Sequence, residues 1–125
     1  MTVNFKSNFV QNGNDFEVAF KAPLLQEDEF EGAKVIEFID PERKIVNRFE
    51  FGEKEILIIA GPSSIQLVLD ETVDNEYPVE NKFMPIVTFM KEYNKEENFF
   101  EFKYELLSTR GDEIGKFHIT ISIEE

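Results

Sequence analysis

Phe100-Glu101-Phe102-Lys103-Tyr104-Glu105-Leu106 is the stretch of sequence that decides the fold. Large apolar side chains occupy every second position, and charged side chains occupy the positions between them. Because successive side chains of a β-strand point to opposite faces, this alternation predicts a strand with one face in a core and the other in water. Residues 117–123 repeat the pattern with Phe and Ile after a turn at 109–113. This end of the chain therefore predicts an antiparallel pair of strands.

Similar short apolar or alternating runs extend over most of the chain. They cover, in order, residues 3–9, 16–20, 35–39, 45–51, 56–60, 65–69, 86–93, 100–106 and 117–123. Asn12-Gly13 is the strongest turn signal between them, since both residues tolerate the positive φ of a tight hairpin turn. No segment has the 3.6-residue period of an amphipathic helix. The pattern predicts an all-β fold of about eight to nine strands with little or no helix.

Three segments carry more specific predictions. Ile56–Ala60 is apolar on both faces, which predicts the most enclosed strand of the protein. The acidic stretch 24–32 loses the alternation, so a turn or a short irregular segment is expected there. Residues 70–82 form the longest weakly patterned stretch, and the sequence predicts a mobile loop.

A single antiparallel up-and-down barrel is the predicted architecture. Consecutive strands usually pair, and a long meander that closes on itself removes the unpaired edges that promote aggregation. A two-sheet sandwich of the same strand count is the alternative. The chain has 125 residues, of which 42% are hydrophobic and 14 are Phe. This is enough for one core, so residues 1–125 are expected to form a single domain.

The charge of the chain limits its partners. There are 26 acidic and 13 basic side chains, giving a formal net charge of −13. Such a charge repels phosphate backbones and anionic lipid headgroups, so neither nucleic acid nor membrane is an expected partner. Cysteine is absent, and no long apolar segment follows the N-terminus. These features predict a cytoplasmic protein without disulfides.

Short motifs along the chain resemble one family: Lys6-Ser7, Gly13, Phe20, Tyr104-Glu105-Leu106, Gly111-Asp112-Glu113-Ile114-Gly115 and Ile119-Thr120-Ile121. They are similar to those of the YwiB-like bacterial proteins of unknown function. The resemblance implies a calycin-like (lipocalin-like) β-barrel and no catalytic residues. The sequence departs from two motifs of that family. Where the family has Arg-x-Gly this chain has only Ala60-Gly61, and where it has aromatic-proline-aromatic-Gly this chain has Phe83-Met84-Pro85-Ile86.

No pattern for catalysis, metal binding or cofactor binding stands out. His118 is the single histidine, and the alternation of its strand points it away from the core. No serine lies in a Gly-x-Ser-x-Gly elbow, and residues 70–76 lack the order of an EF-hand loop. The glycines fall at turns rather than in a phosphate-binding loop. A hydrolase would require several acids and His118 to meet in one cleft. We therefore expect no enzyme, metal site or cofactor.

Binding is the predicted role, and two hypotheses remain open. A barrel lined by aromatic rings can hold a small apolar ligand in its interior or at its mouth, although the same rings can simply fill the core. The predicted ligand-lining residues are Phe49, Phe89, Phe100, Phe102, Tyr104 and Phe117. The alternative is a protein-interaction or regulatory domain that uses its acidic surface or an open strand edge to bind a basic partner protein. The sequence leaves the oligomeric state undetermined.

Overall fold

Ten β-strands and no helix make up the computed structural model, which describes residues 1–125. The strands are β1 (Thr2–Gln11), β2 (Asn14–Phe30), β3 (Ala33–Ile39), β4 (Val46–Phe51), β5 (Glu55–Ala60), β6 (Ser63–Val68), β7 (Thr72–Val79), β8 (Lys82–Lys95), β9 (Phe99–Leu107) and β10 (Glu113–Glu124). The all-β prediction is confirmed, with ten strands instead of eight or nine. There is accordingly no helix with the length and apolar character needed to cross a bilayer.

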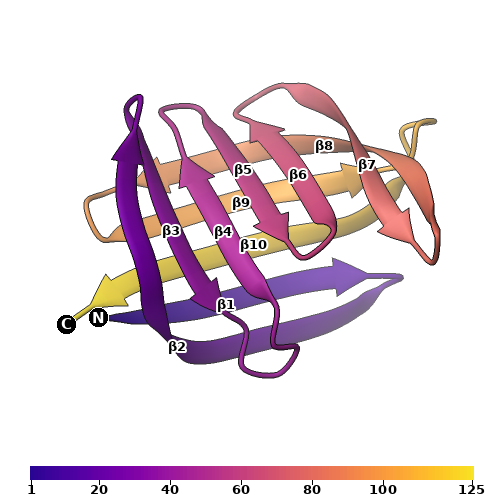
Figure 1. Ribbon diagram of the computed structural model, residues 1–125. Helices are drawn as coiled ribbons and strands as arrows, with labels where there is room; N and C mark the ends of the chain where they lie inside the picture. Colours follow the sequence, from indigo (N-terminus) through magenta and orange to yellow (C-terminus); the bar gives the residue numbers. More distant parts are fainter.

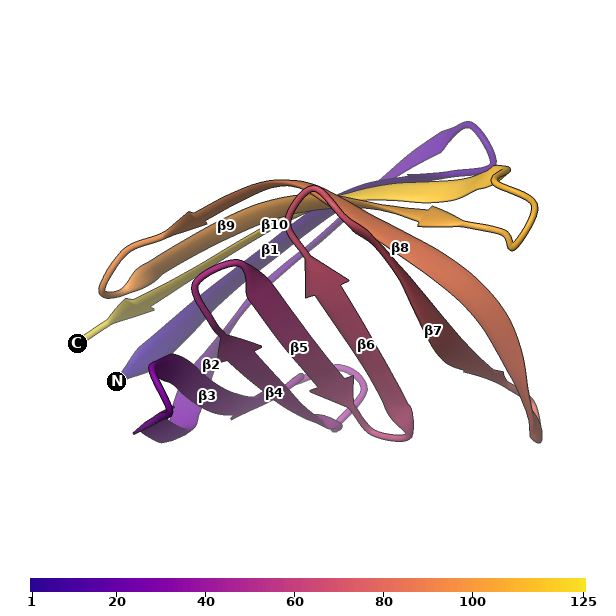
Figure 2. The same cartoon turned by 90° about the horizontal axis from the view of Figure 1, so that it is seen from above.

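The strands close into one antiparallel barrel in up-and-down order (Figure 1). Each strand pairs with the next along the chain, and β1 closes the ring by pairing with both β2 and β10. The two termini lie side by side, since Thr2 is opposite Glu124. At the other end of the barrel lie the β1–β2 turn, the β7–β8 turn and the β9–β10 loop (Figures 1 and 2). We call this the hairpin end.

Both segments predicted to be irregular form strands. The stretch 24–32 continues β2 to Phe30, where it pairs with β3, and 70–82 contains all of β7. Residues 25–30 are exposed, and so is most of β7. These segments are held by backbone pairing and bury few side chains, so no alternation marks them in the sequence. The tight turn at Asn12-Gly13 is confirmed, with positive φ at both residues.

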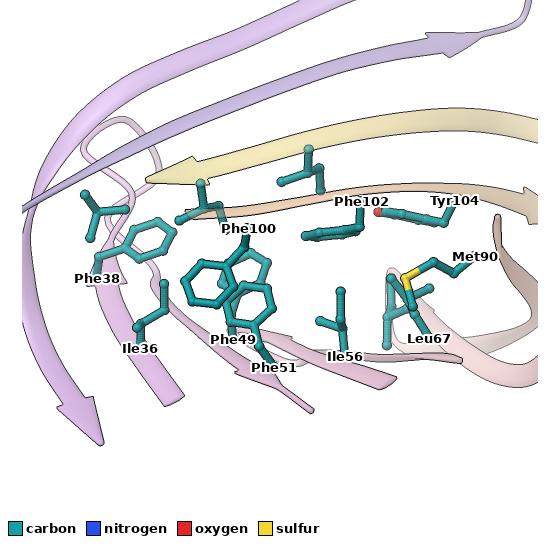
Figure 3. Packing of buried hydrophobic residues seen from close by; sticks show 14 of the residues in the cluster. Ile36, Phe38, Phe49, Phe51, Ile56, Leu67, Met90, Phe100, Phe102 and Tyr104 are labelled. Carbon is teal, nitrogen blue, oxygen red and sulfur yellow. The ribbon is translucent and has the colours of Figure 1, made fainter. Parts of the chain in front are cut away.

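The core occupies the barrel interior and consists mainly of Phe, Ile and Leu (Figure 3). Phe51 and Phe100 are fully buried, and their rings stack with centroids 3.9 Å apart. Phe49 stacks on Phe51 at 5.7 Å. Rings at alternating positions of β4 and β9 therefore fill the space between opposite walls of the barrel, which is how protein interiors reach crystal-like density.

Ile56–Ala60 is not the most enclosed strand. Ile56 is fully buried, whereas the side chains from Leu57 to Ala60 are only half-buried. The wall of a barrel is a single layer of strands, so one face of β5 packs into the core and no second layer covers the other. Apolar residues on both faces of a strand do not by themselves place it at the centre of a fold.

A β-bulge in β8 changes which side chains face inward. The register with β9 shifts between Met90 and Glu92. Thr88 and Met90 are fully buried on the inner face, so Phe89 lies on the outer face. Beyond the bulge Tyr93 packs against the core. The prediction that Phe89 lines the interior is therefore wrong: alternation was extended from Tyr93 across an inserted residue.

Candidate functional site

Four aromatic side chains form a row across the inner face of neighbouring strands. Phe16 of β2, Phe9 of β1, Phe117 of β10 and Tyr104 of β9 are directly opposed in the strand register. Their ring centroids are 5.1, 5.3 and 4.9 Å apart in that order, and successive ring planes differ by 18°, 16° and 8°. We call this row the aromatic ladder. Its geometry is the offset stacking that aromatic pairs prefer.

Exposure rises from one end of the aromatic ladder to the other. Tyr104 is 6% exposed, Phe117 and Phe9 are half-buried, and Phe16 is 47% exposed. Phe16 lies close to the β1–β2 turn, so the exposed rungs belong to the hairpin end. The ladder therefore connects the buried core with an apolar surface that water reaches.

Further apolar side chains are exposed on the β7–β8 hairpin, whose tip lies at the hairpin end. Tyr77 and Met84 are directly opposed and share the face of buried Ile86. They are 41% and 44% exposed. Single exposed apolar residues are normal in proteins, but several on the inner face at one end of a barrel resemble the apolar rim of a binding site.

The hydroxyl of buried Tyr104 differs from that of half-buried Tyr93. Tyr93 donates a hydrogen bond from its hydroxyl to the carbonyl oxygen of Gly52 at 2.7 Å. Tyr104 forms no such bond, and Figure 3 shows its hydroxyl directed along the interior toward Phe102. Burial raises the pKa of Tyr104 well above its usual range, and nearby Tyr77 adds to the rise. The group therefore stays a neutral hydroxyl.

This raised pKa predicts a loss of stability in alkali. The unfolded chain ionises Tyr104 above pH 10, whereas the folded barrel keeps it protonated, so stability is intact below pH 10 and falls as pH rises above it. Replacing Tyr104 with Phe should reduce the loss between pH 10 and 11 by about 1 kcal/mol. Urea unfolding of both proteins at pH 9, 10 and 11 measures it. Equal losses in the two proteins would contradict the prediction.

Ion pairs on the outer face of β8, β9 and β10 border a hollow of about 470 Å³, whose lining also includes residues of β1 and β2 and all four residues of the aromatic ladder. Each cation there contacts an acid: Lys91 with Glu105, Lys103 with Glu92, Lys116 with Glu113, and His118 with Glu101. His118 lies on the outer face, as its strand pattern predicts. No group of three His, Asp or Glu side chains is close enough to hold a metal ion.

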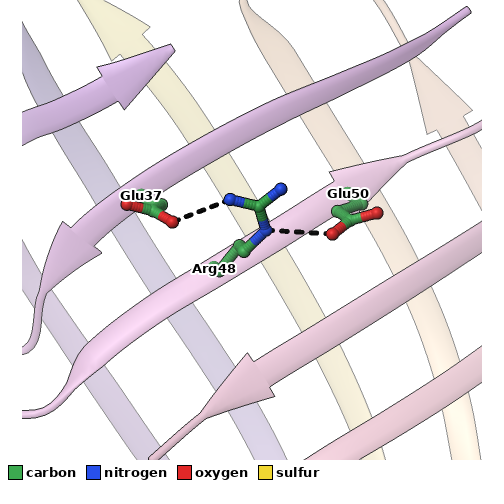
Figure 4. Close-up of polar contacts among 3 residues, drawn as sticks. All are labelled: Glu37, Arg48 and Glu50. Carbon is green, nitrogen blue, oxygen red and sulfur yellow. Dashed lines mark hydrogen bonds and ion pairs between the residues drawn. The ribbon is translucent and has the colours of Figure 1, made fainter. Parts of the chain in front are cut away.

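Arg48 is a second centre of charge on the outer face, on β4 (Figure 4). It donates hydrogen bonds to Glu37 on β3 at 2.8 Å and to Glu50 on its own strand at 2.9 Å. These two bonds, with that to Glu37 first, raise the pKa of Arg48. The guanidinium of Arg48 therefore links β3 to β4, and both carboxylates already accept a hydrogen bond from it.

The pairing of β6 with β7 is the weakest seam of the barrel. Ser64 opposite Glu76 is its one paired position, while β7 pairs with β8 at eight positions. Beyond this position the side chain of Asn75 makes the hydrogen bonds that strand pairing would otherwise provide. Its Oδ1 accepts from the Gln66 N–H at 2.8 Å, and its Nδ2 donates to the Gln66 carbonyl oxygen at 2.9 Å. Thr88 donates to the same carbonyl at 2.9 Å. We call these three residues the side-chain latch.

Comparisons with known proteins agree with this fold. No model of a protein family matches the chain. An uncharacterized protein of Mycoplasmopsis pulmonis (strain UAB CTIP) is 35% identical over 129 residues, covering 100% of both chains. The crystal structure of ywiB protein from Bacillus subtilis superposes with a TM-score of 0.76 over 99% of this chain and 91% of that chain, at 14% identity. The chain belongs to the same family as this uncharacterized protein of Mycoplasmopsis pulmonis, and it has the fold of ywiB protein. The resemblance found in the sequence is thereby confirmed.

In this YwiB-like barrel the six predicted lining residues separate into three groups. Phe49, Phe100 and Phe102 lie at the centre of the core and pack against other rings (Figure 3). Tyr104 and Phe117 belong to the aromatic ladder. Phe89 faces outward. The structure thus brings two of the six together at a surface that a ligand could reach.

Two residues of the aromatic ladder in this YwiB-like chain were missing from the predicted lining set, Phe9 and Phe16. A signal for them is present in the sequence. A two-residue turn at Asn12-Gly13 places residues whose numbers sum to 25 opposite each other, so Phe9 must oppose Phe16. The opposition of Phe9 to Phe117 follows only from the closure of the barrel, which the sequence does not specify.

Proposed function

We propose that the chain is a non-enzymatic, cytoplasmic binding protein that holds a small apolar molecule at the hairpin end of its barrel. The observation that carries the proposal is the graded exposure of the aromatic ladder, from buried Tyr104 to Phe16, which is 47% exposed. Covering exposed ring surface is favourable by roughly 25 cal/mol per Å². A flat apolar molecule laid on these rungs would remove that surface from water.

The mouth of the barrel is a better place for a ligand than its centre. Phe51, Phe100 and Phe102 are fully buried, and the ring of Phe51 packs against both of the others, so ring atoms already fill the centre of the barrel. At the hairpin end Phe9 and Phe117 are only half-buried. The apolar body of the ligand would thus contact the partly exposed rungs of the ladder at the mouth of the barrel.

Binding of a neutral fluorescent probe tests this proposal. N-phenyl-1-naphthylamine should show a saturable rise in fluorescence with the wild-type protein, and Phe16→Ser should weaken the binding about tenfold, because one exposed ring is worth roughly 1–2 kcal/mol. Phe83→Ser is the matched control, since Phe83 is 63% exposed but lies on the outer face of β8.

Equal weakening by Phe16→Ser and Phe83→Ser would show that the probe binds exposed apolar surface without preference for the aromatic ladder. Absence of saturable binding to the wild-type protein would contradict the proposal outright. Native mass spectrometry of protein purified from cells is a second measurement, in which a lipid-like or other small apolar adduct is the supporting result.

A basic protein partner is the second candidate, and the charges near the β6–β7 seam favour it. Asp74 and Glu76 are exposed on neighbouring outward positions of β7, and neither forms an ion pair within the chain. They border a hollow of about 480 Å³ together with Ser64 and Phe83. A partner bound by these carboxylates should be captured from lysate at low salt and released at high salt, and Asp74→Asn with Glu76→Gln should abolish its capture.

A further inference from the structure

The hydroxyl of Tyr104 is an unused polar group inside an apolar site. Every side-chain nitrogen or oxygen that is sealed within the protein has a hydrogen-bond partner. The Tyr104 hydroxyl has none, so it borders space that an atom of the size of water can reach. The residue is nevertheless only 6% exposed. Its ring stacks with the rings of Phe117 and Phe102, at centroid distances of 4.9 and 6.0 Å, and its hydroxyl is the one polar group that has no partner.

Water satisfies such a hydroxyl poorly at this place. A buried water usually needs two to four polar partners. Apart from nearby Tyr77, the neighbours of Tyr104 are apolar: the rings of Phe102 and Phe117 and the side chain of Met90, which opposes it on β8. A water there would therefore be short of hydrogen-bond partners. A larger molecule with an apolar body and one polar atom would bury the surface of the rings and also form a hydrogen bond with the Tyr104 hydroxyl.

The charges around the site decide the kind of polar atom. All 18 residues of the core cluster are uncharged, and the chain as a whole carries a net charge of −13. An anionic group would find no cation in the core, and the cations of the hollow that the ladder residues also line, Lys91, Lys103, Lys116 and His118, are each already paired with an acid. A cation would be desolvated without a carboxylate to pair with. A neutral hydroxyl or carbonyl avoids both costs, and a tyrosine hydroxyl can donate to it or accept from it.

We propose that the ligand of this barrel is a neutral, mainly apolar ring compound with one hydroxyl or carbonyl group, and that the Tyr104 hydroxyl forms its specific hydrogen bond. This inference rests on the proposed function and defines its ligand class. Tyr104 sets the specificity, whereas the half-buried Phe9 and Phe117 supply apolar contact that does not distinguish a polar analogue from an apolar one.

A pair of matched probes tests the inference. Naphthalene and 2-naphthol differ by one hydroxyl, and their dissociation constants are measured with wild-type protein and with Tyr104→Phe. Comparing the ratio of the two dissociation constants between wild-type protein and variant cancels the different hydration of the two probes. We expect Tyr104→Phe to reduce the preference for 2-naphthol about five- to tenfold, the range of one net hydrogen bond, and to leave the affinity for naphthalene unchanged.

Tyr93→Phe is the control, because it removes a partly buried hydroxyl that is already bonded to Gly52. It should leave the ratio unchanged, and circular dichroism checks that each variant is folded. An unchanged ratio in Tyr104→Phe, with both probes still binding, would overturn the inference and leave the proposed function standing. Failure of the wild-type protein to bind either probe would contradict both.

Discussion

Replacing Phe51 with Ala is expected to lower the free energy of unfolding by about 3–5 kcal/mol, the usual cost of truncating a buried Phe. Phe51 is fully buried, and its ring lies 3.9 Å from that of Phe100 and 5.7 Å from that of Phe49, centroid to centroid. Alanine would remove the transfer free energy of the ring and leave a cavity between two walls of the barrel. Equilibrium unfolding in urea, followed by circular dichroism, measures the change.

Phe83→Ala is the control for this prediction, since Phe83 is on the outer face and 63% exposed. It should change the free energy of unfolding by no more than about 0.5 kcal/mol. A loss below 1 kcal/mol in Phe51→Ala would mean that the interior is loosely packed. The proposal that the ligand binds at the mouth and not in the centre would then lose its main support.

The sequence predicts the core more accurately than it predicts the strands around it. Wherever one face of a strand is buried, as at Phe100 and Phe102, burial imposes an alternation that can be read directly. The outer half of β2 and most of β7 bury little, so only their backbone pairing defines them, and pairing leaves no mark on composition. Their exposure is the physical reason that they were predicted as irregular segments.

The placement of single residues fails where one inserted residue changes the phase. The bulge after Met90 turns Phe89 outward, although strict alternation places it on the same face as Tyr93. No glycine or proline marks that position, so the sequence carries no local signal of the bulge. Register across the closure of the barrel is equally hidden, which is why Phe117 and Tyr104 were predicted to line a site without Phe9 and Phe16.

The free hydroxyl of Tyr104 could not be predicted for a different reason. Hydrogen bonding of a side chain depends on atoms from strands that are distant in sequence: Tyr93 reaches Gly52, 41 positions away. Nothing in the sequence around Tyr93 or Tyr104 indicates a hydrogen-bond partner for either hydroxyl, and only the three-dimensional arrangement shows that one is bonded and the other is not. The sequence predicts Tyr104 as a lining residue, and the structure adds the unbonded hydroxyl on which the proposed hydrogen bond to a ligand depends.

Replacing Asn75 with Ala is expected to weaken the seam between β6 and β7 and to lower the free energy of unfolding by about 1–3 kcal/mol. The change removes both hydrogen bonds between Asn75 and Gln66 and the bond from Asn75 to Thr88 at 3.0 Å, so the buried Thr88 hydroxyl keeps fewer partners. Asn75→Asp should be as harmful, because a carboxylate can accept from the Gln66 N–H but faces the Gln66 carbonyl without a proton to donate.

Hydrogen exchange separates this local effect from a general loss of stability. In Asn75→Ala the amide of Gln66 should exchange faster by more than the global change in free energy explains, whereas amides that pair β4 with β5 should follow the global change. Asn94→Ala is the control, since Asn94 is an exposed asparagine of the same barrel wall. If Gln66 keeps its protection, the seam is held by other contacts. If it loses protection alone, one asparagine side chain substitutes for a missing strand pairing and keeps the barrel closed.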